Sequence, residues 1–372
     1  MLKAADFEIM RAAVGNDPSL ADVIKMVHPK PASATREALY GYLIGKPHDA
    51  GVLPEVVKAF EAFKRDPSLP VPEVTFQMLT SMPLTREHWV QIAETAGWQM
   101  LRQNLNTFAR NGVFEVEGFG EKLAKRLGDE REVKRSRVFP YQLMMAFNSV
   151  DPGVPQVVRD ALQDAMEIAL ANVPSVEGNV VVCPDVSGSM ASPVTGFRKG
   201  STSAVRCIDV AALVAAALLR RNPTAKVLPF ENDVVDIHLN ARDTVMTNAA
   251  RLAAIGGGGT NCSAPLAKLV KQRARVDLVV FVSDNQSWVD ATQHPHQGTA
   301  TMQEWRKLKA LNPKAKLVCI DIQPYTTVQA KGDVDVLNVG GFSDRVFGVI
   351  GSMLSANGDP DHWVRAIDAV TL

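Results

Sequence analysis

Three short loops carry the oxygen-bearing side chains of this chain that are best suited to chemistry. The first, Asp185-Val-Ser187-Gly-Ser189, follows an apolar run and offers one carboxylate and two hydroxyls at alternating positions. The second places Thr260 directly after four glycines, and the third places Asp284 at the end of another apolar run. Oxygen ligands of this kind suit Mg²⁺ or Mn²⁺. The sequence therefore predicts a divalent-cation site built from these five residues.

A turn that merely caps the following helix is the other interpretation of the Asp-x-Ser-x-Ser loop. Three loops that agree in order, strand context and residue type favour the cation site. The sequence lacks complete motifs of three classes of enzyme. The glycines at 256–259 lack the Gly-Lys-Ser/Thr of a phosphate loop, and Ser283-Asp284 has no accompanying Ser-x-x-Lys. An aspartyl phosphatase would need a carboxylate where Ser187 stands. We therefore expect a binding protein and not an enzyme.

Composition leaves the partner open. The chain has 372 residues, with 40 Lys and Arg against 40 Asp and Glu, so no global field favours nucleic acid or cationic partners. Its four cysteines are widely spaced, which argues against a structural zinc and a disulfide framework. No run approaches the ~20 apolar residues that a membrane span needs. We expect a cytoplasmic protein without a membrane partner.

The elements that must position these loops belong to two sequence patterns. The first is helical, with apolar residues at three- and four-residue spacing, and predicts helices over 20–27, 33–44, 53–65, 72–82, 85–96, 98–110, 119–127, 141–150 and 155–172. The second alternates strands with helices. It predicts strands over 180–183, 226–229, 234–239, 276–282, 316–320 and 334–338, and helices over 204–221, 243–254, 262–273, 301–311 and 343–354.

The change of pattern predicts two domains. Residues 1–173 form a HEAT-like helical-repeat array, and residues 178–372 form a doubly wound α/β domain. Ligands of such α/β sheets bind outside the carboxyl ends of the strands, where Asp185 and Asp284 fall.

Basic side chains in the helical half are candidates for phosphate binding. Between Lys122 and Arg137 there are seven basic and three acidic residues. A solvated amphipathic face is the commoner explanation of such a run, and a phosphate-binding stripe is the sharper one. His28 stands at a helix end, where a cap or core histidine competes with a role in ligand contact.

Both halves together resemble the Ro, or TROVE, family of RNA-binding proteins. The three loops resemble the metal-ion-dependent adhesion site of von Willebrand factor A domains. The motifs that carry the resemblance are 22–31, 82–85, 101–105 and 137–141 in the helical half, and 185–189, 258–262 and 281–285 in the second half.

The resemblance implies a HEAT-repeat ring that binds small noncoding Y RNA on its outside and single-stranded ends of misfolded RNA through its hole, in RNA quality control. It also implies an exoribonuclease as a working partner. From the cation site itself we expect a protein partner to donate an Asp or Glu carboxylate to the metal. Candidate RNA contacts, drawn from charge and family position, are Arg11, His28, Lys30, Arg36, Lys46, Arg102, Arg110, Lys122, Lys125 and Arg126.

Two departures from the family pattern alter the expectation. Family members carry further repeats before the segment that begins here, so we expect either a truncated chain or an open ring. Only Arg11 is basic in the stretch 7–18, where relatives often have a denser basic segment for Y RNA. Two alternatives therefore stay open: a protein–protein adaptor with no RNA role, and a metal-dependent hydrolase of RNA or phosphoesters.

Overall fold

The fold was obtained as a computed structural model. It describes residues 4–15, 17–196, 205–284, 300–324, 330, 333–343, 345–355 and 362–368. The chain packs as two compact units: residues 1–123 with 151–155, and residues 124–150 with 156–372. Sequence pattern and packing divide a chain by different criteria, so the boundary predicted at 173 to 178 stays a prediction.

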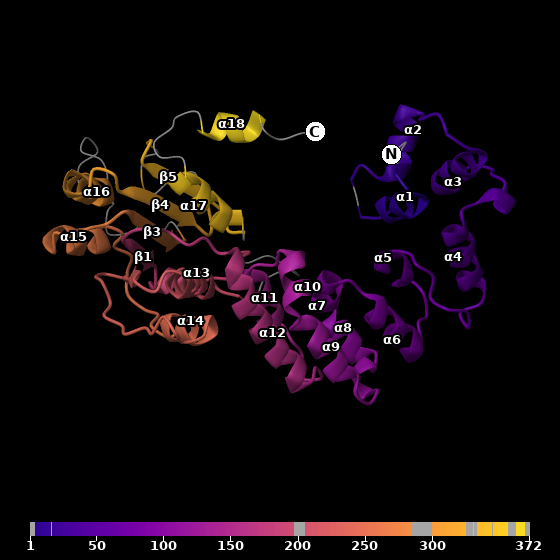
Figure 1. Cartoon of the computed structure of the whole chain (residues 1–372), viewed down its shortest axis with the longest axis horizontal. Helices are drawn as coiled ribbons and strands as arrows, with labels where there is room; N and C mark the ends of the chain where they lie inside the picture. The colour runs from indigo at the N-terminus through magenta and orange to yellow at the C-terminus, as the bar shows by residue number, and fades with distance from the viewer. Residues whose placement is uncertain are drawn as a thin grey trace. The chain divides into compact units, whose positions relative to one another are not determined.

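The first unit is helical, as predicted. Its helices are α1 (Asp6–Ala12), α2 (Leu20–Val27), α3 (Ala34–Ile44), α4 (Glu55–Arg65), α5 (Phe76–Leu79), α6 (Arg86–Thr95), α7 (Trp98–Gln103) and α8 (Leu105–Arg110), and α9 (Phe119–Leu127) follows (Figure 1). Each helix is short and buries one face. In α4, for example, Val57, Phe60 and Phe63 recur at helical spacing and are buried. Packing of such faces stabilises helices that are too short to persist alone.

The predicted helix over 98–110 is broken into α7 and α8. Asn104 lies at the break with φ −114°, and its side-chain amide donates to the carbonyl of Met100 at 2.8 Å. Asparagine competes in this way for backbone groups that would otherwise continue a helix. The helix predicted over 72–82 shortens to α5, and α1 was not predicted.

The second unit begins with helices that precede the sheet in sequence: α10 (Glu130–Ser136), α11 (Pro140–Asn148) and α12 (Gln156–Ala169). Asp129 accepts a hydrogen bond from the backbone N–H of Glu132 at 2.9 Å and so caps α10, a helix that was not predicted. The Phe139 ring, before α11, stacks on Phe347 at 6.0 Å between centroids. These helices therefore share a core with the α/β domain.

The α/β domain is built on a parallel five-stranded sheet in the order β2-β1-β3-β4-β5, which confirms the predicted fold class. The strands are β1 (Val180–Pro184), β2 (Lys226–Val227), β3 (Leu278–Ser283), β4 (Lys316–Asp321) and β5 (Val336–Gly340). Every residue of β1 and β3 is buried, as is usual where helices cover both faces of a parallel sheet.

Helices cover both faces of this sheet (Figure 1). On one face, α15 (Ala264–Lys271) and α16 (Ala300–Leu311) pack through Leu266 and Trp305 against alternate strand residues such as Cys183 and Phe281. On the other face lies α13 (Cys207–Arg221), which is buried along most of its length and is itself covered by α14 (Val245–Ala253). The remaining helices are α17 (Arg345–Ser355) and α18 (His362–Asp368).

The strand predicted over 234–239 is wrong. Residues 231–233 turn the chain back on itself, so that Val234 forms only an isolated bridge to Phe230 and Val235 donates to the carbonyl of Pro229 at 2.8 Å. The neighbouring strand β2 has only two residues. An alternating apolar pattern becomes a strand only where a partner strand offers enough backbone groups.

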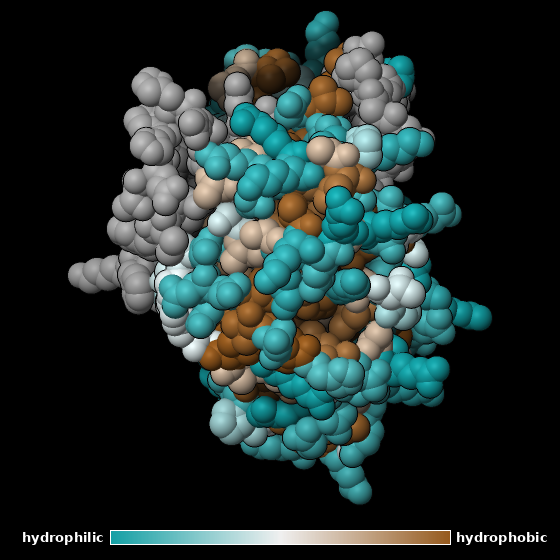
Figure 2. Space-filling model, turned by 90° about the vertical axis from the view of Figure 1, so that its left-hand side faces the viewer, coloured by the Kyte–Doolittle hydropathy of each residue, from teal (hydrophilic) through white to brown (hydrophobic). Residues whose placement is uncertain are grey.

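The surface is mixed in polarity. On the face seen in Figure 2, hydrophobic side chains gather near the middle and hydrophilic ones surround them. No helix within the described ranges is long and apolar enough to cross a bilayer.

Candidate metal centre

The end of β1 fixes the carboxylate of Asp185. Its backbone N–H donates to the carbonyl of Val282 at 2.9 Å, so the ladder with β3 continues one residue beyond the strand. One carboxylate oxygen accepts the backbone N–H of Ser187 at 2.9 Å, and the other accepts the hydroxyl of Ser283 at 2.7 Å. Asp185 is completely buried. Donors on both oxygens therefore set its orientation.

The three predicted hydroxyls form a chain beside this carboxylate. The Thr260 hydroxyl donates to the Ser187 hydroxyl at 2.9 Å, and the hydroxyls of Ser187 and Ser189 lie 3.2 Å apart. Thr260 and Ser187 are buried, whereas Ser189 is half-buried. The structure therefore brings together, at one edge of the sheet, oxygens from two loops that are 73 residues apart in sequence.

The glycine loop lets the second of these loops approach the first. Gly188 donates its backbone N–H to the carbonyl of Gly258 at 3.1 Å. Gly258 has φ +52°, and a Cβ there would collide with the Glu231 carboxylate. A Cβ on Gly259 would lie 2.7 Å from the side-chain oxygen of Asn232. The left-handed φ of Gly258 favours glycine at that position, and at Gly259 a side chain would fit only if Asn232 moved.

Asp284 supplies the second carboxylate, directly after β3, and is almost fully buried. Burial raises the pKa of Asp185 to about 6, and the negative charge of Asp284 adds to that rise. The two carboxylates therefore feel each other's field. A cation placed among them would offset the cost of burying both charges.

The donor set fits a hard divalent cation. Two carboxylates and three hydroxyls offer only oxygen ligands, as Mg²⁺ and Mn²⁺ prefer. Among the residues that the structure describes, no three His, Cys, Asp or Glu side chains gather closely enough to hold one ion. Hydroxyls, and not further acidic groups, would therefore complete a cation site here.

Two polar residues at this edge were not predicted. Ser283 orients Asp185 through its hydroxyl, and Asp321 ends β4 with only 3% of its surface exposed. The signal for Asp321 was available, since it is an aspartate that directly follows a predicted strand. Asp185 and Asp284 likewise lie within two residues of the end of a predicted strand.

The predicted RNA contacts of the first unit differ in exposure. Arg11, His28, Lys30, Lys46 and Arg110 are exposed. His28 is the C-cap of α2 in the left-handed conformation, with φ 47°, and follows two exposed apolar residues. The stretch from α2 to α3 therefore presents basic and apolar side chains together.

Arg36 and Arg102 have partners within the fold. Arg36 pairs with Asp6 at 3.1 Å and donates to the carbonyl of Ala4 at 2.8 Å. Arg102 is 7% exposed, and its guanidinium donates to the side-chain oxygen of Gln99 at 3.0 Å. In this conformation Arg36 joins α3 to the chain around α1, whereas Arg102 bonds within its own helix.

Helix α9 carries the other three predicted contacts. Lys122 is exposed, pairs with Glu94 at 2.5 Å and lies over the Phe119 ring. Lys125 is exposed and Arg126 is half-buried. An exposed ion pair contributes little to stability, so Lys122 can exchange its partner for a phosphate at small cost.

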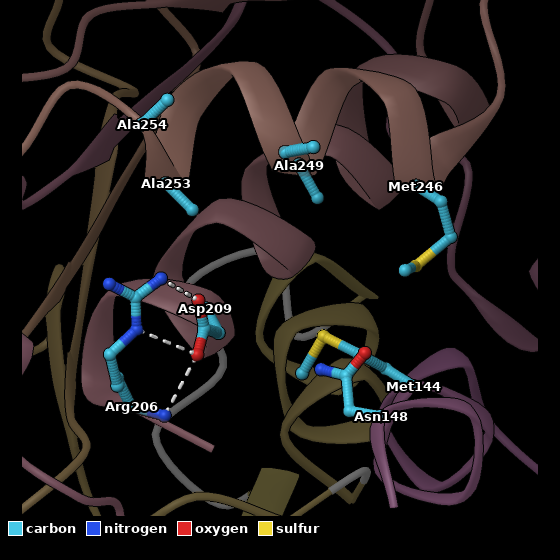
Figure 3. A pocket seen from close by; sticks show the side chains of 9 residues that line it. Met144, Asn148, Arg206, Asp209, Met246, Ala249, Ala253 and Ala254 are labelled. Carbon is cyan, nitrogen blue, oxygen red and sulfur yellow. Dashed lines mark hydrogen bonds and ion pairs between the residues drawn. The ribbon is translucent and has the colours of Figure 1, made fainter. Parts of the chain in front are cut away.

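A pocket of 330 Å³ lies beside the first turn of α13 (Figure 3). Four alanines of α14 and its flank, with Met144 and Met246, form an apolar wall. The charged groups at its edge neutralise each other, because Arg206 pairs with Asp209 at 2.6 Å. The pocket is therefore mainly apolar, and the two charged side chains at its edge bind each other.

Family profiles match both halves of the chain. The TROVE domain matches residues 23–222, and the Ro60 vWA domain matches residues 179–354. The chain belongs to the Ro (TROVE) family. The resemblance found in its motifs is therefore confirmed, and this Ro-family protein joins helical repeats to a von Willebrand factor A domain.

Individual relatives agree with the family. This Ro-family protein is 26% identical to the RNA-binding protein RO60 of Deinococcus radiodurans over 351 residues, which are 87% of this chain and 63% of that relative. It is 22% identical to the RNA-binding protein RO60 of Caenorhabditis elegans over 237 residues, 61% of this chain and 35% of that relative. The chain thus spans less than two thirds of either relative.

A solved structure supports the fold. The crystal structure of the Deinococcus radiodurans RO (RSR) protein matches with a TM-score of 0.68 at 22% identity, over 96% of this chain and 74% of that one. At this identity the match speaks for the fold alone.

Proposed function

We propose that this protein binds RNA through its helical half and docks a protein partner through a divalent cation held at Asp185. The observation that carries the proposal is the hydrogen-bonded set of Asp185, Ser187, Ser189 and Thr260 in a member of a family whose relatives are named RNA-binding proteins. Small noncoding RNA, single-stranded ends of misfolded RNA and a role in cytoplasmic RNA quality control are the finer parts of this proposal.

The RNA half of the proposal rests on exposed basic side chains on a helical scaffold. Lys30, Lys46 and Lys125 are exposed. Lysine and arginine side chains of this kind grip backbone phosphates with little reading of sequence. The exposed Met26 and Val27 next to His28 offer apolar surface on which an unpaired base can lie.

The metal half of the proposal gives the described carboxylates and hydroxyls of the site a role in binding. Asp185 and the two serines would bind Mg²⁺ or Mn²⁺ directly, and Thr260 and Asp284 directly or through water. The cation supplies an electrophile for a carboxylate from a partner, such as an exoribonuclease. Hydrogen bonds orient Asp185, Ser187, Ser189 and Thr260, so their oxygens are positioned before an ion binds.

RNA binding is tested by filter binding of a small structured RNA and a single-stranded RNA across a salt series. We expect affinity to fall steeply with salt, and the double substitution Lys30→Ala with Lys46→Ala to lower the salt slope by about one to two. Lys58→Ala is the matched control, because Lys58 is a surface lysine paired within its own helix with Glu55. Absence of a salt-dependent affinity would sink the RNA proposal.

An RNA cleavage assay with the same purified protein tests whether it is an enzyme. We expect no cleavage of either RNA in Mg²⁺. Cleavage that disappears in Asp185→Ala would overturn the proposal of a non-enzyme and support the hydrolase.

An adaptor without an RNA role is the second candidate, and the apolar pocket favours it. The pocket adjoins Arg206, the N-cap of α13, and the next residue, Cys207, has a thiol whose pKa burial raises to about 12, with the charges of Asp284 and Asp185 adding to the rise. The pocket and the acidic edge are therefore neighbours. Methionines in such a wall adapt to varied apolar side chains. Protein binding without RNA binding would favour the adaptor.

A further inference from the structure

Asp321 continues a row of polar side chains across the carboxyl edge of the sheet. Ser283 and Asp321 are paired residues of the parallel strands β3 and β4, so their side chains leave the same face. Asp185 follows the paired residues Pro184 and Val282, and it accepts the Ser283 hydroxyl at 2.7 Å. The row therefore runs from Asp185 through Ser283 to Asp321.

One oxygen of Asp321 has no donor among the described residues. The side chain is 3% exposed, and its Oδ1 accepts no hydrogen bond from any described residue. A buried carboxylate oxygen left in this way costs free energy, so such groups are normally satisfied by a donor or a cation. Burial raises the pKa of Asp321 to about 7, and the charge of Asp284 adds to the rise. The Asp321 carboxylate therefore lies close enough to the candidate metal centre to feel the charge of Asp284.

Direct binding to the cation does not account for this oxygen. No three acidic, His or Cys side chains of the described chain gather around one point, so Asp321 is not a third carboxylate ligand beside Asp185 and Asp284. A bound Mg²⁺, however, keeps several of its waters, and their hydrogens are strong donors. A water on the cation extends the reach of the site by one hydrogen bond.

We propose that Asp321 is an outer residue of the metal centre, whose unpaired Oδ1 accepts a hydrogen bond from a water molecule held by the cation. The proposal rests on the metal site proposed above. It makes Asp321 a positioning residue that holds one water in place and adds negative charge next to the ion. Removing that charge should weaken cation binding. Mutation of a residue that binds a metal ligand through a hydrogen bond typically lowers metal affinity by about 10- to 100-fold.

The test is a Mn²⁺ titration of the full chain, with free Mn²⁺ measured by electron paramagnetic resonance after removal of metal with a chelator. The proteins are the wild type, Asp321→Asn, Asp321→Ser, Asp185→Ala and the control Asp236→Asn. Asp236 is a matched control because it is an aspartate of the same unit, is almost fully exposed and lies outside the row. Thermal unfolding of the metal-free proteins is measured alongside.

We expect Asp321→Asn and Asp321→Ser to raise the Mn²⁺ Kd at least about tenfold, Asp236→Asn to leave it within about twofold, and Asp185→Ala to abolish saturable binding. The metal-free Asp321→Asn protein should unfold at the wild-type temperature or above, since a buried charge is removed. An unchanged Kd overturns the role of Asp321 while the metal site stands. A lowered unfolding temperature assigns Asp321 a structural role instead. If the wild type does not saturate, both proposals fail.

Discussion

At the scale of single residues, Asp185 organises the candidate centre. It is buried, accepts hydrogen bonds on both oxygens and feels the charge of a second buried carboxylate, Asp284. Burial disfavours the charged form of an acid, and a neighbouring negative charge disfavours it further. The pKa values of Asp185 and Asp321 accordingly rise from 3.8 to about 6 and about 7.

These raised pKa values predict how metal-free stability depends on pH. Between pH 4 and pH 7 the folded protein binds more protons at Asp185 and Asp321 than the unfolded chain does, so their contribution to the free energy of unfolding falls as pH rises. We expect the melting temperature in chelator, measured by circular dichroism from pH 5 to pH 8, to fall less in Asp321→Asn than in the wild type. Asp236→Asn should keep the wild-type slope. Identical slopes in all three proteins would contradict the burial argument.

At the scale of elements, α12 is joined to the α/β domain by specific hydrogen bonds. Glu167 of α12 accepts the backbone N–H of Val245, the first residue of α14, at 2.9 Å and pairs with Arg220 of α13 at 3.3 Å. A carboxylate that binds a free N–H at a helix start acts as its cap and opposes the helix dipole. Glu167 therefore stabilises α14 from another helix.

Glu167→Ala tests this connection. We expect the free energy of unfolding to fall by about 1–2 kcal/mol, because the N–H of Val245 loses a charged acceptor and Arg220 loses its partner. Denaturant unfolding measures the change. Glu130→Ala is the control, since it removes an exposed pair with Lys134 within one helix and should cost about 0.5 kcal/mol or less. Equal losses in the two variants would show that Glu167 is an ordinary surface acid.

At the scale of the whole molecule, the helical pattern and the α/β domain are not separated in packing as they are in sequence. The end of α13 holds residues 173–176, which follow α12. Its C-cap Asn222 accepts the N–H of Val176 at 2.7 Å, and Arg221 donates to the carbonyl of Val173 at 3.1 Å. The TROVE match also runs through α13 to residue 222. The last repeat helices and the sheet therefore form one packing unit.

Two fragments decide where the folding boundary lies. We expect residues 124–372 to unfold cooperatively, and residues 178–372 to melt at least about 5 °C lower or to aggregate, because the shorter fragment exposes the apolar faces of α13 and α14 that α11 and α12 cover. Scanning calorimetry of both fragments measures the difference. Equal melting temperatures would instead support the boundary predicted from the change of sequence pattern.

The sequence by itself determined the fold class and most helices and strands, and it predicted the five residues of the candidate site. Apolar periodicity reports which faces are buried, and a polar residue directly after a buried strand marks the carboxyl edge of the sheet. The same rule applied to the strand before Asp321 would have found that carboxylate too. The prediction over 98–110 missed a break because a single Asn104 side chain competes for the backbone.

Only the tertiary structure decided which oxygens face each other and which basic side chains are buried. The Thr260 and Ser187 hydroxyls meet across 73 residues of sequence, and Arg102 turns inward to Gln99 although arginine is usually exposed. The strand predicted over 234–239 is absent because the neighbouring β2 is too short to pair with it. The periodicity of apolar residues along the sequence indicates which side chains are buried. Contacts between segments far apart in sequence depend instead on how whole helices and strands pack.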